Sequence, residues 1–597
     1  MSFIVPTERR HWKTRALLAT MYLLLVAGAI SMVYPFLLML SGSVKSDLDF
    51  DQFEIIPSYW YDDQVLFQKF ELARYKGNAW RFQLAARSTL EAFEDIRVPR
   101  INEPRVLDLW AFFTSGQVPP DFVTPGQTHE PGAQPRVLRE FRNWLVARFD
   151  GDLDRLNRRF GLTLKNWDEV TVPEVEMLGR TQRHGTEPLE VLYRTEFRPH
   201  LPARAFWPIH VEGVFHADLR GRYRRSIEAL NLDLGTKFQS FADVPLPRRY
   251  PAGEPHAPAW ERFVREVINL EFLRLRTRRE PGRSEVEMPL PARCPESGPG
   301  YYDFKSFIED GDCLPFVEID SFEFRYRDFL QQKYGSIDAV NAAYGTQYGS
   351  TGSVPLHLVE LDAWILREHR GEVLWEFLTR NYRHSFSYLV LRGRAFWVTF
   401  LYCGLNVLLH MLVNPLAAYA MSRYRFRWAH WVLLFCVLTM AFPAEVGGIP
   451  RFLLLRELGL LNTIWALVLP GAAHGFSIFI LKGFFDGLPS ELYEAARIEG
   501  APEHWMFRHV TLALTKPILA VIAFGAFTSA YGGFMFALIV CPDERMWTIS
   551  VWLYQFQQSV TEPVAFSALV LASLPVLGAF LLAQRFILQG IVLPVEK

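Results

Sequence analysis

The sequence predicts an all-α integral membrane protein with six transmembrane helices and an inserted, mainly helical or α+β domain outside the membrane. Three observations predict this architecture. Apolar residues are concentrated at the two ends of the 597-residue chain, and the middle is charged and contains many prolines, like a soluble domain. The 63 basic and 64 acidic residues nearly balance, which argues against a nucleic-acid-binding surface.

The first apolar segment, residues 16–40, contains 25 residues without a charge. As a helix it extends about 37 Å, which exceeds the roughly 30 Å of bilayer hydrocarbon. A cleaved signal peptide is the alternative, because basic residues precede the run. The apolar part of a signal peptide is usually only about 7 to 15 residues long, so we favour a retained helix. Residues 1–42 are then a cytoplasmic segment and the first span.

The apolar pattern returns at residue 395 and continues to residue 588, with short polar interruptions. It predicts five further helices, at residues 395–421, 428–449, 462–482, 515–540 and 564–588. Together with the first run they make six, and residues 395–597 form the membrane core.

Basic residues predict the orientation of these helices in the cell (inner) membrane. The N-terminal cluster, the turn at 422–428 and the loop with Lys482, Arg497 and Arg508 fall on one side if the helices alternate. Positive loops are typically cytoplasmic, so both termini are expected there and residues 43–394 are expected to be extracytoplasmic.

A polar helix is predicted within the cytoplasmic loop 486–517. Glu491 in its first turn suits the helix dipole, and Ala495 and Ala496 favour helix before Gly500 interrupts it. Leu492, Ala495, Ala496 and Glu499 share one face at helical spacing, which favours docking to a protein. The alternative is a helix lying on lipid, but such helices are typically basic, whereas this one is acidic.

The loop carries a motif as well as a helix. Glu494-Ala495-Ala496, Gly500-Ala501, Phe507, Leu512 and Pro517 match the EAA loop of ABC-importer permease subunits. Further matching stretches lie at 416–427, 449–471, 479–500 and 584–590. In this ordered series the chain resembles the carbohydrate-uptake, MalG-like, binding-protein-dependent family over residues 1 to about 60 and about 380 to 597.

The resemblance implies the type I ABC-importer permease fold and the import of a carbohydrate, such as a sugar or oligosaccharide. It implies partners as well: cytoplasmic ATPase subunits, a second permease subunit and an extracytoplasmic solute-binding protein, within membrane lipid and without nucleic acid. The chain has no G-x-x-x-x-G-K-[S/T] phosphate loop, so we expect no cofactor and no enzyme activity of its own. The residues implied to couple to the ATPase are Glu494, Ala495, Ala496, Gly500, Ala501, Phe507 and Pro517.

The chain departs from the family pattern at three places. Glu499 replaces the usual Asp before the glycine, and Ala513 replaces the proline of a Leu-Pro pair. Residues 530–534 replace a Trp-Asn-Asp stretch, so the contacts usually made there are not expected.

Several polar residues fall in or near the predicted spans. We expect hydrogen bonds between helices, rather than sugar contacts, to account for them. They are Asn406, His410, Asn414, Glu445, His474 and Gln584.

The segment between the first two spans is about 350 residues long, whereas family members use a short connection there. It contains a diffuse repeat at 148–173, 222–247 and 333–356. Each copy predicts a helix that stops at a glycine, with an asparagine one turn earlier. The asparagines are Asn157, Asn231 and Asn341, and the glycines are Gly161, Gly235 and Gly345. A packing module duplicated for structure is the favoured interpretation.

Other interpretations of the segment are open. One copy resembles a helical stretch of (β/α)8 β-galactosidases, so a membrane-anchored extracellular carbohydrate-processing or recognition protein is the alternative function, although no catalytic carboxylate pair is evident. The acidic residues between Glu309 and Asp320 favour solvated surface over a Ca²⁺ site, and no zinc spacing occurs. Cys294 and Cys313 are equally compatible with a disulfide and with free thiols.

Overall fold

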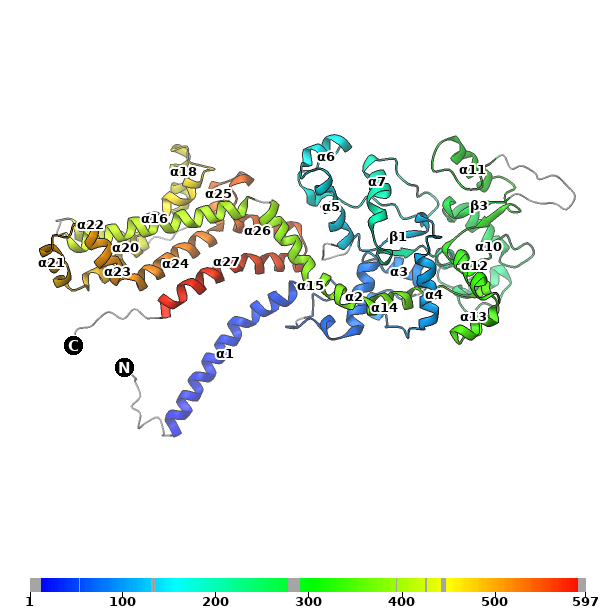
Figure 1. Ribbon diagram of the computed structural model, residues 1–597, viewed down its shortest axis with the longest axis horizontal. Helices are drawn as coiled ribbons and strands as arrows, with labels where there is room; N and C mark the ends of the chain where they lie inside the picture. The colour runs from blue at the N-terminus through cyan, green and yellow to red at the C-terminus, as the bar shows by residue number, and fades with distance from the viewer. Residues whose placement is uncertain are drawn as a thin grey trace. The chain divides into compact units, whose positions relative to one another are not determined.

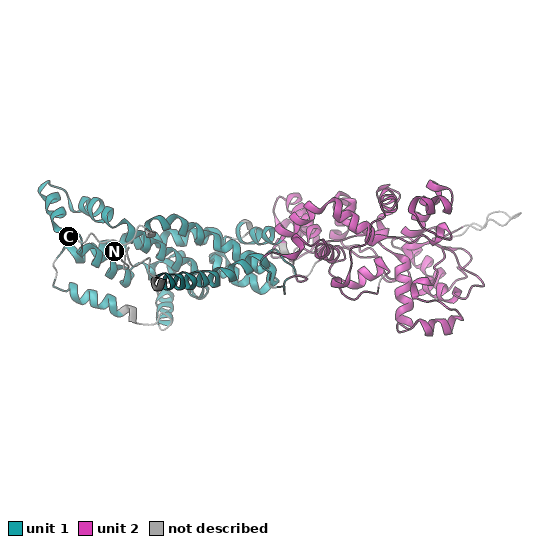
Figure 2. Cartoon of the chain, turned by 90° about the horizontal axis from the view of Figure 1, so that it is seen from below, with its two compact units in different colours: residues 1–46, 50–55, 381–597 teal, residues 47–49, 56–380 magenta. Residues whose placement is uncertain are grey.

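The chain divides into two compact, mostly helical units (Figures 1 and 2). The computed structural model describes residues 12–52, 54–87, 89–129, 133, 135–276, 290–392, 394–424, 427–441 and 447–588. Unit 1 comprises residues 1–46, 50–55 and 381–597, and unit 2 comprises residues 47–49 and 56–380.

The sequence-based boundary at residue 394 differs from this division, because residues 381–394 belong to unit 1. Ser385 in α15 (Arg370–Phe386) shares a hydrogen bond with Ser567, at 2.7 Å between hydroxyl oxygens. Tyr388 stacks on Phe556 with ring centroids 4.4 Å apart. These contacts attach the segment to the membrane-type helices.

Three helices of unit 1 are long and apolar enough to cross a membrane: α1 (Trp12–Gly42), α16 (Ala395–Arg423) and α27 (Glu562–Leu588). Helix α16 packs against α20 (Gly475–Asp486) and α24 (Lys516–Gly532), and α24 packs against α27. The helical, membrane-type character predicted for this part of the chain is confirmed.

The described residues do not show the six spans that the sequence predicts. Two bent pairs also pass as apolar spans when each is counted once: residues 464–471 with 475–486, bent by 44°, and residues 503–514 with 516–532, bent by 85°. They bring the total among the described residues to at most five. Helix α17 (Ala429–Ala441) is shorter than a span, and the expected continuation to residue 449 passes through residues 442–446, outside the described residues.

The remaining helices of unit 1 are short. They are α18 (Gly448–Glu457), α19 (Ile464–Val468), α21 (Ser490–Ile498), α22 (Glu503–Trp505), α23 (Leu512–Leu514), α25 (Phe534–Val540) and α26 (Ile549–Ser559).

Unit 2 combines short helices with two small antiparallel sheets, so it has the α+β character that the sequence left open. Thr124 of β1 (Val123–Pro125) lies opposite Trp207 of β2 (Phe206–Pro208). Arg274 of β3 (Leu273–Leu275) lies opposite Glu318 of β4 (Val317–Ile319). The helices are α2 (Asp63–Arg74), α3 (Ala79–Ala86), α4 (Glu103–Thr114), α5 (Arg136–Arg148), α6 (Leu153–Phe160), α7 (Pro188–Leu192), α8 (Val211–Arg222), α9 (Ile227–Leu234), α10 (Ala257–Arg262), α11 (Pro299–Glu309), α12 (Phe322–Tyr334), α13 (Ile337–Tyr344) and α14 (Leu358–Glu368).

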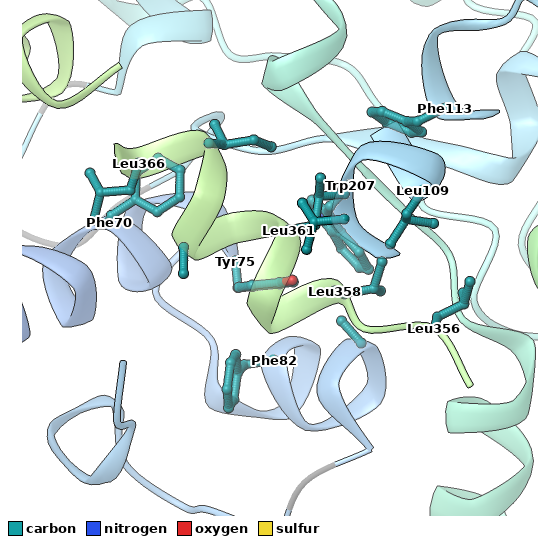
Figure 3. Close-up of a cluster of buried hydrophobic side chains, with 14 of the residues drawn as sticks. Phe70, Tyr75, Phe82, Leu109, Phe113, Trp207, Leu356, Leu358, Leu361 and Leu366 are labelled. Atoms are coloured by element: carbon teal, nitrogen blue, oxygen red, sulfur yellow. The ribbon is translucent and has the colours of Figure 1, made fainter. Parts of the chain in front are cut away.

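The core of unit 2 joins the beginning of the unit to its end. Figure 3 shows Phe70, Tyr75 and Leu109 gathered around Leu361 of α14, with Trp207 of β2 beside them. Tyr75 and Trp207 are fully buried, and their rings lie 5.2 Å apart. Because segments about 290 residues apart close one core, the two ends of unit 2 lie close together, as an inserted domain requires.

The three predicted repeat helices are α6, α9 and α13. Each ends at a glycine in the left-handed region, Gly161, Gly235 and Gly345, with φ of 66°, 65° and 66°. In α13, the Asn341 amide donates to the Tyr348 carbonyl at 2.9 Å and accepts from the Tyr348 N–H at 2.8 Å. The same two bonds join Asn157 to Leu164 and Asn231 to Phe238.

A second polar contact recurs in the repeats, and the sequence pattern did not reveal it. The helix preceding each repeat helix carries a buried donor that bonds a valine carbonyl at 2.9 Å. These pairs are Arg142 with Val170, His216 with Val244, and Arg327 with Val354. Each copy is therefore closed by one asparagine and one donor from the previous helix.

Unit 2 also buries charged residues, and two of its buried cations are paired, as burial favours. Lys69 lies 2.7 Å from Asp49, and Arg74 lies 2.8 Å from Asp362. Its two cysteines, Cys294 and Cys313, are buried free thiols, so the disulfide that the sequence left open is not formed.

Candidate functional site

The candidate site is helix α21, the acidic helix of the loop 486–517. Pro489 precedes it, and Glu491 lies in its first turn, where a negative charge favours the helix dipole. Gly500, with φ of 80°, stops it. The Gly500 N–H donates to the Arg497 carbonyl at 3.0 Å and the Ala501 N–H donates to the Ala496 carbonyl at 2.9 Å. These two bonds form a Schellman motif, which explains why Gly and Ala stand at these positions.

One side of α21 is buried. Tyr493 and Ala496 are 4% and 8% exposed and pack into an apolar cluster with α16, α20 and α24. The other members of that cluster are Ala418, Tyr419, Met421, Ile478, Leu481, Phe485, Met506 and Ile518. The inner side of α21 is thereby attached to α16, α20 and α24.

Arg423, at the end of α16, contacts α21 at the aromatic ring of Tyr493. Its guanidinium lies 3.7 Å from the centre of the Tyr493 ring, and it donates to the Phe485 carbonyl at 2.7 Å. The Tyr493 hydroxyl shares a hydrogen bond with Thr511 at 2.7 Å. A cation over an aromatic face is attractive, so Arg423 links α16, α20 and α21.

Glu503 forms a second link, beyond the glycine stop. It accepts from the Tyr419 hydroxyl at 2.8 Å and from Arg497 at 3.2 Å. Phe507 packs edge-on against Tyr419 with ring centroids 5.1 Å apart. The segment after the stop is therefore attached to α16 as well.

The opposite side of α21 is exposed. Glu494 and Ala495 lie there, with Leu492 at 43% and Ile498 at 88% exposed. Apolar side chains beside carboxylates on one short helix suit a protein partner. The shared face expected from the sequence is wrong in one respect, because Ala496 points inward and supports the helix.

The chain turns sharply after the loop. Residues 503–514 and α24 meet at 85°, and Pro517 is in the first turn of α24, where a missing N–H costs nothing. The bend is present although Ala513 replaces the family's proline, because it is located at Thr515, between α23 and α24.

Two of the six polar residues, Asn406 and Asn414, make side-chain hydrogen bonds between helices, as expected, whereas His410 bonds the Asn406 carbonyl and His474 bonds Ser477 within their own helices. Asn406 donates to the Ala526 carbonyl at 2.9 Å, joining α16 to α24. Asn414 accepts from the His474 N–H at 2.8 Å, joining α16 to the start of α20. Gln584 is half-exposed on α27, and Glu445 lies outside the described residues.

Sequence reasoning missed the roles of Tyr419, Arg423 and Thr511, and it noted Glu503 only as one of the acidic residues of the loop. Arg423 was noted only as part of a basic turn that sets orientation. Its partners lie 62 and 70 positions away, at Phe485 and Tyr493, and no local periodicity signals such contacts.

Comparisons with a family model and with individual proteins indicate the same family. The family described as "Binding-protein-dependent transport system inner membrane component" matches residues 414–592. The probable ABC transporter permease protein YurM of Bacillus subtilis (strain 168) is 31% identical over 198 residues, which are 32% of this chain and 65% of YurM. The matched part thus spans just under two thirds of that relative.

Two further relatives are covered more fully. The polygalacturonan/rhamnogalacturonan transport system permease protein YtcP of Bacillus subtilis (strain 168) is 29% identical, over 36% of this chain and 79% of YtcP. A putative ABC transporter permease protein, ORF1, of Streptomyces antibioticus is 34% identical, over 30% of this chain and 80% of its own length. The chain belongs to the family of binding-protein-dependent transport system inner membrane components.

Proposed function

We propose that the chain is the membrane-spanning permease subunit of an ATP-driven, binding-protein-dependent importer of carbohydrates. Its family and the relatives named as transport-system permeases support this, and one of those names specifies polygalacturonan and rhamnogalacturonan. The observation that carries the proposal is α21, which is fixed on its inner side by Tyr493 and Ala496 and presents Glu494, Ala495 and Ile498 outward.

In this proposal α21 docks into a cleft of a cytoplasmic ATPase subunit, and that subunit hydrolyses ATP. The contacts of Arg423 and Glu503 connect α21 to α16 and α20, so a displacement of α21 is passed to the long helices. Closure of the ATPase pair then moves α21 and opens the path toward the outside. A second permease subunit completes the path.

The positive loops support a cytoplasmic position for α21 and for both termini. Residues 43–394, which contain unit 2, then lie outside the membrane, where a solute-binding protein delivers the carbohydrate. We propose that unit 2 contacts that binding protein.

Charge reversal at Glu494 tests the coupling. In a reconstituted complex, Glu494→Lys should lower ATPase association and uptake by about tenfold or more, because it places a like or unpaired charge in a docked interface. Glu457→Lys is the matched control: Glu457 is also exposed on a short helix of unit 1, on the predicted outer side. Equal uptake by the two variants would remove α21 from the mechanism.

The orientation has a separate test. Protease added outside sealed, right-side-out vesicles should cut within unit 2 and leave the loop 486–517 intact. Cleavage of that loop from outside would contradict both the orientation and the role of α21.

A further inference from the structure

Unit 2 contains a polar cavity of about 260 Å³ that none of the coupling contacts uses. It lies among α4, α12 and β3, which Figure 1 shows in the same part of the unit. Its lining comes from three arginines, two aspartates, two glutamines and two phenylalanines. They are Arg248, Arg274, Arg325, Asp320, Asp328, Gln117, Gln332, Phe112 and Phe329.

Both aspartates of the cavity are already neutralised by arginines. Asp320 accepts from Arg325 at 2.8 and 2.7 Å and from Arg293 at 2.9 Å. Burial alone raises the pKa of Asp320, but the hydrogen bonds and charge of Arg325, with the charges of Arg293 and Arg248, lower that pKa on balance. Asp328 accepts from Arg248 at 2.9 Å. Asp320 therefore stays ionised, and because both carboxylates are already paired with arginines they do not form a cation site.

Arg274 differs from Arg248 and Arg325 in having no aspartate partner. It belongs to β3, its side chain is exposed, and among the residues that the structure describes it has no ion-pair or side-chain hydrogen-bond partner. With Arg248 and Arg325 it gives the lining three positive charges against two negative ones. A free guanidinium in a cavity of net positive charge favours an anion, and its fork of donors matches a carboxylate.

The remaining lining indicates what carries that carboxylate. The half-buried Phe329 forms an aromatic wall, and its ring centroid lies 5.6 Å from that of the buried Phe112 behind it. Gln117 and Gln332 supply amides that both donate and accept hydrogen bonds. A sugar ring has an apolar face for the aromatic wall and hydroxyls for the amides, whereas a bare inorganic anion uses neither. The volume is slightly below that of a drug-sized pocket, which suits one or two sugar rings.

We propose that this cavity binds a hexuronic acid residue of an acidic oligosaccharide, with the carboxylate at Arg274 and the ring against Phe329. The proposal rests on the proposed function for the carbohydrate class and adds the acidic character of the sugar. It assigns to unit 2 the capture of the end of an incoming saccharide.

The test is calorimetric titration of the purified full-length chain in lipid nanodiscs with trigalacturonate and with neutral galactotriose. Trigalacturonate should bind and galactotriose should bind at least about tenfold more weakly, the loss expected for one charged hydrogen-bond partner. Arg274→Gln should weaken trigalacturonate binding by a similar factor. Arg249→Gln is the control, because Arg249 is the sequence neighbour of Arg248, is exposed and does not line the cavity.

Asp328→Asn provides a change in the opposite direction. It removes a negative charge and releases Arg248 from its ion pair, so it should tighten trigalacturonate binding several-fold. A misfolded variant cannot show tighter binding, and Asp328 is more than half exposed. Absence of trigalacturonate binding, equal binding of the neutral sugar, or no effect of Arg274→Gln would each overturn the proposal.

These outcomes are distinguishable from a failure of the proposed function. The titration needs no ATPase subunit and no transport, and Glu494→Lys should leave trigalacturonate binding unchanged. If Glu494→Lys abolishes uptake while the chain fails to bind trigalacturonate, the cavity proposal alone is wrong.

Discussion

Helix α21 of unit 1 and helix α13 of unit 2 are built with the same local device. Both are short, with nine and eight residues, and both stop at a glycine of positive φ, 80° at Gly500 and 66° at Gly345. The difference lies in what secures the stop. In α13 the Asn341 amide bonds both backbone groups of Tyr348, and Arg327 bonds the Val354 carbonyl.

In α21 no asparagine closes the chain after the glycine. The stop is a Schellman motif, and the contacts that hold the loop come from Tyr419 and Arg423 of a long helix. Ile498 is 88% exposed, although it belongs to the last turn. The comparison teaches that a short helix with a glycine stop can serve two purposes. In α13, where residues of the same repeat secure the stop, the helix is part of a packing module. In α21, which is attached to α16 and exposes an apolar side, the helix is a surface that can move with α16.

The largest expected effect is a loss of stability in acid in the second repeat, where His216 bonds the Val244 carbonyl. Burial, with the nearby charge of Arg87, lowers the pKa of His216 to about 4, against 6.5 in an unfolded chain. The folded state therefore holds neutral His216, and the stability is fully present above pH 6.5 and is lost as the pH falls from 6.5 toward 4. The loss reaches about 3 kcal/mol. Hydrogen exchange of residues 211–247 in the intact protein at pH 7 and pH 4.5 measures it.

His216→Gln is the control for that titration. A glutamine amide can still donate to the Val244 carbonyl but does not titrate in this range. The variant should lose the part of the pH dependence confined to residues 211–247, while the peptides of α21 behave alike in both proteins. An unchanged pH profile would mean that His216 does not close the repeat.

The second expected effect tests the asparagine clamp. Asn341→Ala leaves the N–H and carbonyl of Tyr348 without partners in a half-buried loop, which should cost about 2 kcal/mol of local stability. Gln347→Ala, in the same loop but exposed, should cost little. Hydrogen exchange of residues 337–356 provides the measurement. Equal effects of the two substitutions would show that the clamp is incidental.

How much of this was predictable differs between the two regions. The helices ending at Gly161, Gly235 and Gly345 followed from the sequence, because a helix and its stop are local. So did α21, because its motif lies within a dozen residues. The partners that distinguish the regions, such as Arg423 over Tyr493 or Arg327 at Val354, join different helices and have no local signature.

The same limit applies to the surface of α21 and to the spans. Helical spacing placed Ala495 and Ala496 on one face, but the cluster beneath α21 decides which alanine is buried. Hydropathy located the apolar runs and not their breaks, such as the 44° bend between residues 464–471 and 475–486. Sequence thus predicts the elements, and their tertiary packing decides which surfaces stay open.

The smallest expected effect on stability comes from replacing the glycine that stops α13 or α21, and these two substitutions compare the purposes of the two helices most directly. At both Gly345 and Gly500 an added Cβ meets no atom within 4 Å, so alanine introduces only the strain of a left-handed backbone. Each Gly→Ala substitution should therefore cost about 1 kcal/mol of local stability.

Uptake should nevertheless distinguish the Gly345→Ala variant from the Gly500→Ala variant. Gly345→Ala loosens a repeat that stays closed by Asn341 and Arg327, and should transport normally. Gly500→Ala loosens the end of α21 that, in the proposed function, presents Ile498 to the ATPase subunit, and should lower uptake several-fold in the reconstituted complex. If both variants transported equally well at equal loss of local stability, α21 and α13 would serve the same purpose, and the distinction between the two regions would be wrong.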